Sequence, residues 1–403
     1  MIAIPSNSAI DPQDPDPRDV KPNNFSETHR DATPAPHPSS NVATLAADAT
    51  HPPQQNGNEE RSGPRNAPRA NNDPRNDKRQ RQNNQPRRDR RDIHGWIVLD
   101  KPIGMTSTQS VAIVKRLFQA KRAGHAGTLD PLASGGLPIA LGEATKTVPF
   151  VMDGRKRYGF MVRWGEERDT DDSEGQVVRT SDVRPTPKSI CDLLPQFTGR
   201  IDQTPPRYSA IKVQGERAYD LARDGETVEL ASRQVEIHQL TLKEQLDRDH
   251  SVFEAECGKG TYVRALARDM GRILGCYGHI CALRRTLVGP FGENVMISLE
   301  RLEALCNRAA SGEGSLADAL LPVETALDDI PALAVTRADA ARLHRGQAVL
   351  LRGRDAPNGS GTVYVTVAGR LLALAEIGNG ELIPKRVFNL TGLTASSGRN
   401  ERV

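Results

Sequence analysis

The chain has 403 residues, a formal net charge of only +3, and 37% hydrophobic residues. This length exceeds one ordinary domain and allows two folded domains with a tail. No apolar run approaches the ~20 residues that a membrane-spanning helix needs, and the N-terminus has neither the basic segment nor the apolar core of a secretory signal. The composition therefore argues against a membrane or secreted protein and favours a soluble, cytoplasmic one.

Residues 1–92 differ in composition from the rest of the chain, and we expect them to be disordered. They are rich in Pro, Asn, Asp and Arg and show no helical or strand period. The first 60 residues contain nine Asp and Glu against three Lys and Arg, whereas residues 61–92 contain eleven Lys and Arg against four acidic residues. The basic part is either a solvated linker or a flexible arm that adds phosphate contacts to a bound RNA.

Regular patterns begin at Gly95. Trp96–Leu99 predicts a buried strand, and Thr106–Thr108 offers N-caps for a helix whose apolar face ends at Phe118. The segment Arg122–Gly142 contains five glycines, which indicates a shaped loop, and Leu137–Leu141 predicts a strand at its end.

Periodicity and turn residues predict the remaining elements. Strands are expected at Tyr158–Arg163, Tyr208–Val213, Val235–Leu242, Ser251–Glu256 and Ile280–Leu287. Helices are expected at Lys188–Phe197, Ala218–Arg223, Thr261–Leu274 and from Ser298 to Cys306, and the acidic segment Glu166–Gly175 reads as an exposed loop. Strands and helices do not alternate regularly, which predicts an α+β fold with a mixed, mainly antiparallel sheet and flanking helices.

The C-terminal part, from about Val323, reads as a separate small β-rich module. A helix is expected at Arg337–His344, followed by strands at Ala348–Leu351, Gly361–Val367 and Leu371–Ile377. The five cysteines form no Cys-x-x-Cys pair and are expected to be buried reduced thiols. Because no phosphate-binding loop or zinc motif occurs at a supporting position, we expect neither a metal nor a nucleotide cofactor.

The loop Arg122–Pro138 contains the residues best suited to chemistry. His125 and Asp130 lie five residues apart, and Pro131 holds Asp130 out of helical geometry. From composition and spacing alone, Asp130 is better explained as a turn-capping residue than as a catalytic one.

A resemblance reverses this interpretation. Gly124–Pro131, GHAGTLDP, resembles the central motif of the bacterial tRNA pseudouridine-55 synthases, the TruB family, apart from minor departures such as Ala126 and Ser134. Residues 95–105 (GWIVLDKPIGM), 142–146 (GEATK), 156–158 (KRY), 208–212 (YSAIK), 259–264 (KGTYVR) and 283–285 (LRR) follow in the family's order. The resemblance covers about residues 93–300 strongly and the C-terminal module loosely.

The resemblance implies a catalytic domain over residues 93–320, a small PUA-like RNA-binding module over 321–392 and a flexible tail over 393–403, after the disordered residues 1–92. It also implies isomerisation of the T-loop uridine of tRNA, at position 55, to pseudouridine. The N1–C1′ bond breaks, the flipped uracil turns, and C5 rejoins the ribose, so no cofactor is needed. The expected enzyme is a monomer that requires no guide RNA or protein partner.

Six site residues are carried over from the family. Asp130 is the expected catalytic carboxylate, Arg264 its ion-pair partner, and Tyr158 the aromatic that stacks on uracil and is a candidate for handling the C5 proton. Tyr262 and Leu283 are expected to line the substrate pocket, and His125 to enter the RNA stack where the uridine has left.

Without the resemblance, the same residues have plainer explanations. Tyr158 would be an ordinary strand aromatic, Arg264 a surface charge on a helix, Tyr262 and Leu283 core residues, and His125 a solvated side chain or a general acid. The pairs Lys115–Arg116 and Lys121–Arg122 suit RNA phosphates or a solvated face equally well. Two other functions also remain open, an RNA-folding protein and a synthase directed by guide RNAs and partner proteins.

Overall fold

The computed structural model describes residues 90–209, 211–213, 216–217, 230–351 and 359–395. Nearly all of the segment predicted to be disordered, the helix predicted at Ala218–Arg223 and most of the predicted tail 393–403 lie outside these ranges. Within the described ranges, no helix combines the length and the apolar character required to cross a membrane.

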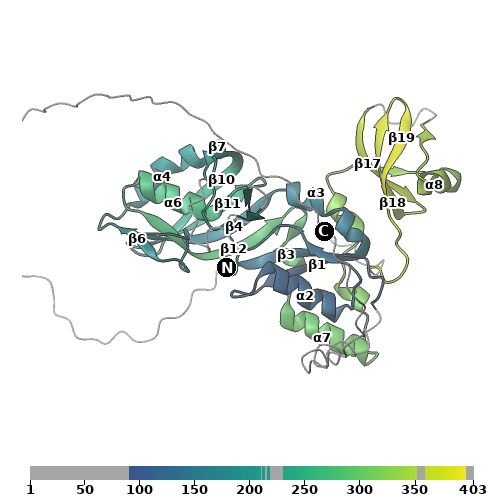
Figure 1. Cartoon of the computed structure of the whole chain (residues 1–403), viewed down its shortest axis with the longest axis horizontal. Helices are drawn as coiled ribbons and strands as arrows, with labels where there is room; N and C mark the ends of the chain where they lie inside the picture. Colours follow the sequence, from purple (N-terminus) through teal and green to yellow (C-terminus); the bar gives the residue numbers. More distant parts are fainter. Residues whose placement is uncertain (1–89, 210, 214–215, 218–229, 352–358, 396–403) are drawn as a thin grey trace, which may run out of the picture. The chain divides into compact units, whose positions relative to one another are not determined.

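A ten-stranded sheet forms the centre of the fold (Figure 1). Most neighbouring strands are antiparallel, but β1 with β14 and β3 with β12 are parallel, so the predicted mixed, mainly antiparallel α+β fold is confirmed. In spatial order the strands are β14 (Ile297–Ser298), β1 (Gly95–Lys101), β3 (Ser134–Leu141), β12 (Gly278–Val288), β4 (Lys156–Trp164), β11 (His250–Cys257), β10 (Arg233–Gln245) and β7 (Gly199–Gln203), with β2 (Ala123–His125) on β3 and β13 (Phe291–Gly292) on β12.

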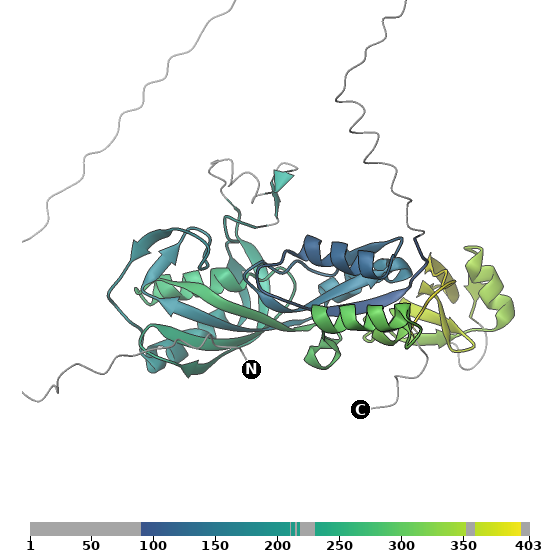
Figure 2. The same ribbon diagram turned by 90° about the horizontal axis from the view of Figure 1, so that it is seen from below.

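The strands around β1 are covered on both faces. Successive β1 side chains enter different apolar clusters: Ile97 packs with α2 (Ser107–Leu117) and α7 (Leu299–Ala310), and Trp96 packs with α3 (Val148–Asp153). Figures 1 and 2 show α2 and α7 beside β1 and β3. A strand buried on both faces is apolar at every position, which explains the continuous run at the start of the folded part.

The strands at the other end of the sheet are covered mainly on one face. Phe160 of β4 stacks on Phe253 of β11 with 5.3 Å between ring centroids, and both lie in the core cluster that includes α4 (Pro187–Leu193) and α6 (Val263–Ile273). The side chains that alternate with them along β4 and β11 are mostly polar and less buried. The half-buried pattern is the one expected of an antiparallel strand with one solvated face.

The C-terminal module contains a five-stranded sheet and has an apolar core of its own. Its strands, in spatial order, are β15 (Ala332–Ala334), β17 (Gly361–Val367), β18 (Arg370–Gly378), β19 (Glu381–Val387) and β16 (Val349–Leu350), and α8 spans Arg337–His344. The predicted helix and three strands are present, whereas β15 and β19 were not predicted.

After the module, the chain returns to the beginning of the folded part. Leu393 donates its amide to the carbonyl of Asp92 at 3.0 Å, and its carbonyl accepts from the amide of His94 at 2.9 Å. The imidazole of His94 lies 2.7 Å from the carbonyl of Thr391 through Nε2. The two ends of the described chain are thus held against each other by backbone pairing.

Four expectations from the sequence are wrong in detail. Glu166–Gly175 is not an exposed loop, because Glu166–Arg168 forms β5, which pairs with β6 (Val177–Thr180), and Glu167, Asp171 and Asp172 are buried. Of the described residues in the strand predicted at Tyr208–Val213, only Lys212–Val213 form a strand, β8. Strand structure in the glycine-rich segment starts earlier than expected, with β2 and with β3 from Ser134. Cys191 is exposed, although Cys257 and Cys276 are buried and all five thiols are free.

Candidate active site

Asp130 lies in the loop between β2 and β3, and its side chain is 35% exposed. The hydroxyl of Ser107, at the start of α2, lies 2.9 Å from both the amide and the carbonyl of Leu129 and so fixes the residue before Asp130. The amide of Gly104 donates to the carbonyl of Pro131 at 2.8 Å and fixes the residue after it. The loop is therefore held on both sides of the carboxylate.

Arg285 of β12 holds the Asp130 loop by hydrogen bonds to its backbone carbonyls. Its guanidinium, 2% exposed, donates to the carbonyls of Gly136 at 2.9 Å, Thr128 at 3.2 Å and Gly127 at 3.1 Å. Gly135, with φ of 101°, leaves no room for a side chain, because an added Cβ would lie 2.2 Å from the carbonyl oxygen of Arg285. The absence of a side chain at Gly135 thus allows β3 to approach β12 closely where β3 leaves the Asp130 loop.

Arg264, the second residue of α6, forms an ion pair with Asp130 at 2.9 Å. The same guanidinium pairs with Asp172 at 3.2 Å and donates to the carbonyls of Thr170 and Tyr208 at 3.0 Å each. Arg264 is only 6% exposed, so the alternative reading of it as a surface charge is wrong. A buried guanidinium with four acceptors has little freedom to move away from the carboxylate.

Tyr158 of β4 lies opposite Arg285 in the strand register and is half-buried. Burial raises the pKa of the Tyr158 phenol, and the charge of Arg285 and a hydrogen bond from it act in the opposite direction. The phenol is therefore in its neutral form near pH 7. Leu283, two residues before Arg285, is 7% exposed and lies in the same apolar cluster against which Tyr158 packs.

Tyr262 and His125 complete the set predicted from the sequence. Tyr262 is the N-cap residue of α6, where its amide donates to Oε1 of Gln203 at 2.8 Å and its carbonyl accepts from Nε2 at 3.1 Å. Burial raises the pKa of the Tyr262 phenol, and a hydrogen bond with Ser209 and the charge of Arg264 act in the opposite direction. His125 is half-buried at the end of β2, paired with Ile139, on the strand that leads into the Asp130 loop.

Three further charged residues belong to the site but were not predicted: Asp172, Arg285 and Lys101. Lys101 is fully buried and donates to the carbonyls of Met105 at 2.8 Å and Pro102 at 2.9 Å. Its burial lowers the pKa of Lys101 to about 8, and the charge of Asp130 opposes this shift. Periodicity assigns charged residues to exposed faces, so it misses those that are buried against backbone carbonyls or an opposite charge. One signal in the sequence could have revealed Asp172. Arg264, Arg268 and Arg272 are spaced four residues apart in α6, so they share one helix face, and cations next to the core need acidic partners.

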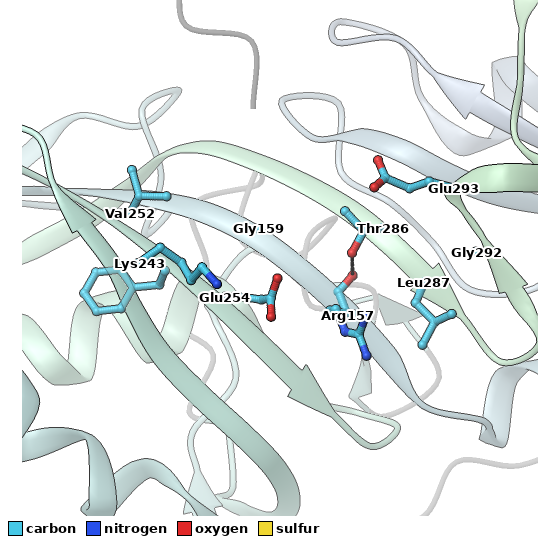
Figure 3. Close-up of a pocket in the computed structure, with 10 residues that line it drawn as sticks. Arg157, Gly159, Lys243, Val252, Glu254, Thr286, Leu287, Gly292 and Glu293 are labelled. Carbon is cyan, nitrogen blue, oxygen red and sulfur yellow. Dashed lines mark hydrogen bonds between the residues drawn. The ribbon is translucent and has the colours of Figure 1, made fainter. Parts of the chain in front are cut away.

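A pocket of about 420 Å³ lies on the face of the central sheet opposite to the face that carries Tyr158 (Figure 3). It lies over β4, β11 and β12, with Arg157, Glu254 and Thr286 among its lining residues. Arg157 precedes Tyr158 in β4 and therefore points to the other side of the sheet. The pocket does not include any of the six predicted site residues, and Arg157 is already paired with Glu256 at 2.7 Å.

Comparisons with known proteins identify the family of the chain. Three family models match successive parts of the chain. They are "TruB family pseudouridylate synthase (N terminal domain)" over residues 115–263, "tRNA pseudouridylate synthase B C-terminal domain" over 264–328 and "Pseudouridine synthase II TruB, C-terminal" over 331–388.

Solved structures share the fold. A structure of an H/ACA RNP bound to a substrate RNA containing 2′-deoxyuridine matches with a TM-score of 0.58 at 23% identity, covering 73% of this chain and 85% of that chain. A Cbf5-Nop10-Gar1 complex matches with a TM-score of 0.57 at 25% identity, covering 73% and 84% of the two chains.

Relatives of similar length are much closer in sequence. The tRNA pseudouridine synthase B of Bradyrhizobium diazoefficiens is 82% identical over 334 residues, which are 83% of this chain and 96% of that protein. The protein of the same name from Rhodopseudomonas palustris is 78% identical over 349 residues, 87% of this chain and 95% of that protein. With these identities over most of its length and TruB models matched in succession, the chain belongs to the TruB family of pseudouridylate synthases.

Proposed function

We propose that this chain isomerises the uridine at position 55, in the T-loop of tRNA, to pseudouridine, with Asp130 as the catalytic carboxylate. The observation that carries the proposal is the 2.9 Å ion pair between the partly exposed carboxylate of Asp130 and the buried guanidinium of Arg264. Relatives that are 82% and 78% identical carry the name tRNA pseudouridine synthase B, which supports tRNA as the substrate.

The isomerisation exchanges one bond for another without net loss or gain of atoms. The N1–C1′ bond of the uridine breaks and a C5–C1′ bond forms, while the proton on C5 leaves and N1 gains a proton. A carboxylate promotes such a step either as a nucleophile that forms a covalent adduct or as a base that starts glycosidic cleavage. Arg264 fixes the direction of the Asp130 oxygens toward the reacting nucleotide.

The remaining site residues receive the base and replace it in the RNA. Tyr158 stacks on the flipped uracil and is the candidate for handling the C5 proton, while Tyr262 and Leu283 line the pocket that holds the ring. His125 occupies the position from which the uridine was extruded, and its flat ring offsets part of the few kcal/mol that unstacking costs.

The proposed enzyme acts alone as a monomer on tRNA in the cytoplasm. The domain limits that accompany this proposal are a tail over residues 1–92, a catalytic domain over 93–320, a PUA-like RNA-binding module over 321–392 and a second tail over 393–403. The fold shared with Cbf5 complexes favours a guide-directed synthase as the second candidate, since those structures are of complexes. Purified protein with a single unmodified tRNA transcript separates the two, because a guide-directed synthase would leave that transcript unchanged.

The first prediction concerns Asp130→Asn. This substitution keeps the shape of the side chain but removes the negative charge, so pseudouridine formation should fall at least about a thousandfold, while tRNA binding stays within about threefold of wild type. The assay measures tritium released from a transcript labelled at C5 of uridine, and filter binding measures affinity. A rate within tenfold of wild type would contradict the assignment of Asp130.

The second prediction is that the reaction requires neither a metal nor a nucleotide. Among residues 90–209, 230–351 and the other described ranges, no group of three or more His, Cys, Asp or Glu is placed to hold a metal ion. Tritium release should therefore continue at the same rate with excess EDTA, provided that monovalent salt keeps the transcript folded. Loss of turnover on an EDTA-treated transcript whose fold is verified would refute the prediction.

A further inference from the structure

Helix α6 presents three arginines to the acidic segment Glu166–Asp172. Arg264, Arg268 and Arg272 are spaced four residues apart, so they lie along one face of the helix. Arg264 pairs with Asp172 at 3.2 Å, Arg268 with Asp171 at 2.9 Å and Arg272 with Glu167 at 2.7 Å. The three acidic side chains are 3%, 7% and 6% exposed, and Arg264 and Arg268 are buried as well, whereas the Arg272 side chain is 45% exposed. The row of ion pairs is therefore open to solvent at Arg272 and buried where it reaches Asp130.

The middle pair, Asp171 with Arg268, ties together segments that are distant in sequence. Arg268 donates to Asp171 from Nη1 at 2.9 Å, to the carbonyl of Thr204 from Nη2 at 2.8 Å and to Asp269 from Nε at 2.7 Å. The carbonyl of Asp171 accepts from the amide of Ile280 in β12 at 3.1 Å. Both the backbone and the side chain of Asp171 are therefore fixed to the sheet and the helix.

The neighbours of Asp171 on both sides bind the same atom of Arg264. Nη1 of Arg264 donates to the carbonyl of Thr170 at 3.0 Å and to the carboxylate of Asp172 at 3.2 Å. Asp171 itself has φ of 60°, in the left-handed region, so the segment turns sharply at this residue. A change of backbone conformation at Asp171 would displace together the two acceptors of Nη1, the carbonyl of Thr170 and the carboxylate of Asp172.

From this geometry we propose that the Asp171–Arg268 ion pair is a positioning pair for the reaction, which holds Thr170 and Asp172 so that Arg264 faces Asp130. The proposal rests on the proposed function, in which Asp130 is the catalytic carboxylate. It differs from a purely structural role because it links the charge of Asp171 to the rate of the chemical step.

The charge of Asp171 changes within an accessible pH range. Burial raises the pKa of Asp171 to about 6, and it is faced by Arg268, Arg264 and Arg272, which act in the opposite direction, and by Asp269, which adds to the shift. Protonation below pH 6 removes the charge that holds Arg268. The single-turnover rate should therefore rise with pH through about 6 as the ion pair forms.

Folding stability should depend on the same ionisation with the opposite sign. Since the pKa of Asp171 in the folded protein lies above its ordinary value of 3.8, the folded state binds the proton more tightly than the unfolded state between pH 3.8 and about 6. The contribution of Asp171 to stability is thus greatest below pH 3.8 and is lost as pH rises through 6. As pH rises through 6, the single-turnover rate should therefore increase while the stability contribution of Asp171 decreases. A purely structural role would make the rate follow stability, so the opposite directions distinguish positioning from a structural effect.

The test is Asp171→Asn, compared with Glu167→Gln in the outermost pair of the row. Asn tolerates the left-handed backbone and keeps the size of the side chain, so the change isolates the charge. We expect the single-turnover rate at pH 7.5 to fall about ten- to a hundredfold, tRNA affinity to stay within about threefold, and the rate increase near pH 6 to disappear. Glu167→Gln should change the rate by less than about threefold, since it lies farther from Arg264.

A double-mutant cycle with Asp172→Asn completes the experiment. If Asp171 acts through Asp172, the rate losses of the two variants should be strongly non-additive. Additive losses, equal losses in Asp171→Asn and Glu167→Gln, or a wild-type rate with the pH limb intact in Asp171→Asn would each overturn the proposal. Should Asp171→Asn fail to fold, Arg268→Gln removes the charge of the other member of the pair and provides the comparison with the acid retained. Asp130→Asn is measured in parallel: if it remains active the proposed function fails, whereas an inactive Asp130→Asn beside a wild-type-like Asp171→Asn refutes only the positioning role.

Discussion

His125, at the end of β2, and Asp130, in the loop that follows, lie close in sequence, yet the chemistry expected of them differs. His125 ends strand β2 and is half-buried, five residues before the carboxylate. We predict that it fills the space left by the flipped uridine and does not transfer a proton. In that case His125→Phe and His125→Asn, which keep a planar group, should retain much more single-turnover activity than His125→Gly, and the penalty should shrink on an RNA whose uridine is already unstacked.

The pH dependence of the same variants distinguishes the alternative role. A general acid at His125 would give equal rate losses in all three variants and would remove a limb of the pH profile near the ordinary histidine pKa of about 6.5. The rate increase proposed for Asp171 occurs near pH 6, close to the ordinary histidine pKa. The pH–rate profile of each His125 variant therefore has to be compared with that of Asp171→Asn. Equal losses with a limb missing only in the His125 variants would show that stacking is the wrong role.

At the scale of elements, β12 determines whether the Asp130 loop keeps its shape. Replacing Arg285 with Lys keeps the charge but leaves at least two of its three carbonyl acceptors, two in the loop and one in β3, without their donor. Since an unsatisfied buried carbonyl costs about 1–3 kcal/mol, the free energy of unfolding should fall by about 2–4 kcal/mol. Urea denaturation measures this, with the neighbouring Arg284→Lys as control.

Arg284 is the appropriate control because it is more exposed than Arg285 and pairs with acids near the surface. Its guanidinium contacts Asp100 at 2.9 Å and Glu293 at 2.9 Å, and its side chain is 20% exposed. The loss for Arg284→Lys should stay below about 1 kcal/mol, the usual range for such pairs. Equal losses for both substitutions would mean that Arg285 does not specifically support the loop.

Most elements were predictable because they follow from periodicity and caps. Thr106 caps α2 and Ser298 caps α7, as the sequence indicates, and the alternation in β4 and β11 reproduces their one buried face. The segment Glu166–Gly175 was misjudged because its charges are neutralised by arginines that come about a hundred residues later. Such pairing is a property of the folded chain, so neither local propensity nor hydropathy reveals it.

The six predicted site residues were found by resemblance to a family, and periodicity alone would have assigned most of them elsewhere. Arg264 shows the reason: its four contacts come from the Asp130 loop, from Thr170 and Asp172, and from Tyr208. Their contribution to the reaction stays a prediction until the variants are measured. The support given by Arg285 and Lys101 was not anticipated, because a basic residue in a strand is normally exposed.

At the scale of the whole molecule, we predict that the basic segment before the folded part strengthens tRNA binding by electrostatic attraction to the phosphates. Residues 61–92 contain eleven Lys and Arg against four acidic residues. Deleting residues 1–89 retains Arg91 and Asp92, which contact the folded part, and should weaken tRNA binding by about three- to tenfold while flattening its dependence on salt. Mapping the modified nucleotide in the truncated protein provides the control, since a change of position would show that the segment selects the site.

The pairing of Leu393 with Asp92 and His94 has a consequence for how the protein forms during synthesis. Most of the chain lies between these partners, so the segment Asp92–His94 gains this pairing only after Leu393 has left the ribosome. Domains usually fold from the N-terminus as translation proceeds, but here the residues just before β1 gain this partner only after Leu393 has been synthesised. Because its two ends meet, the folded part is suited to circular permutation, in which a short linker joins residues 395 and 90 and new termini open at a surface loop.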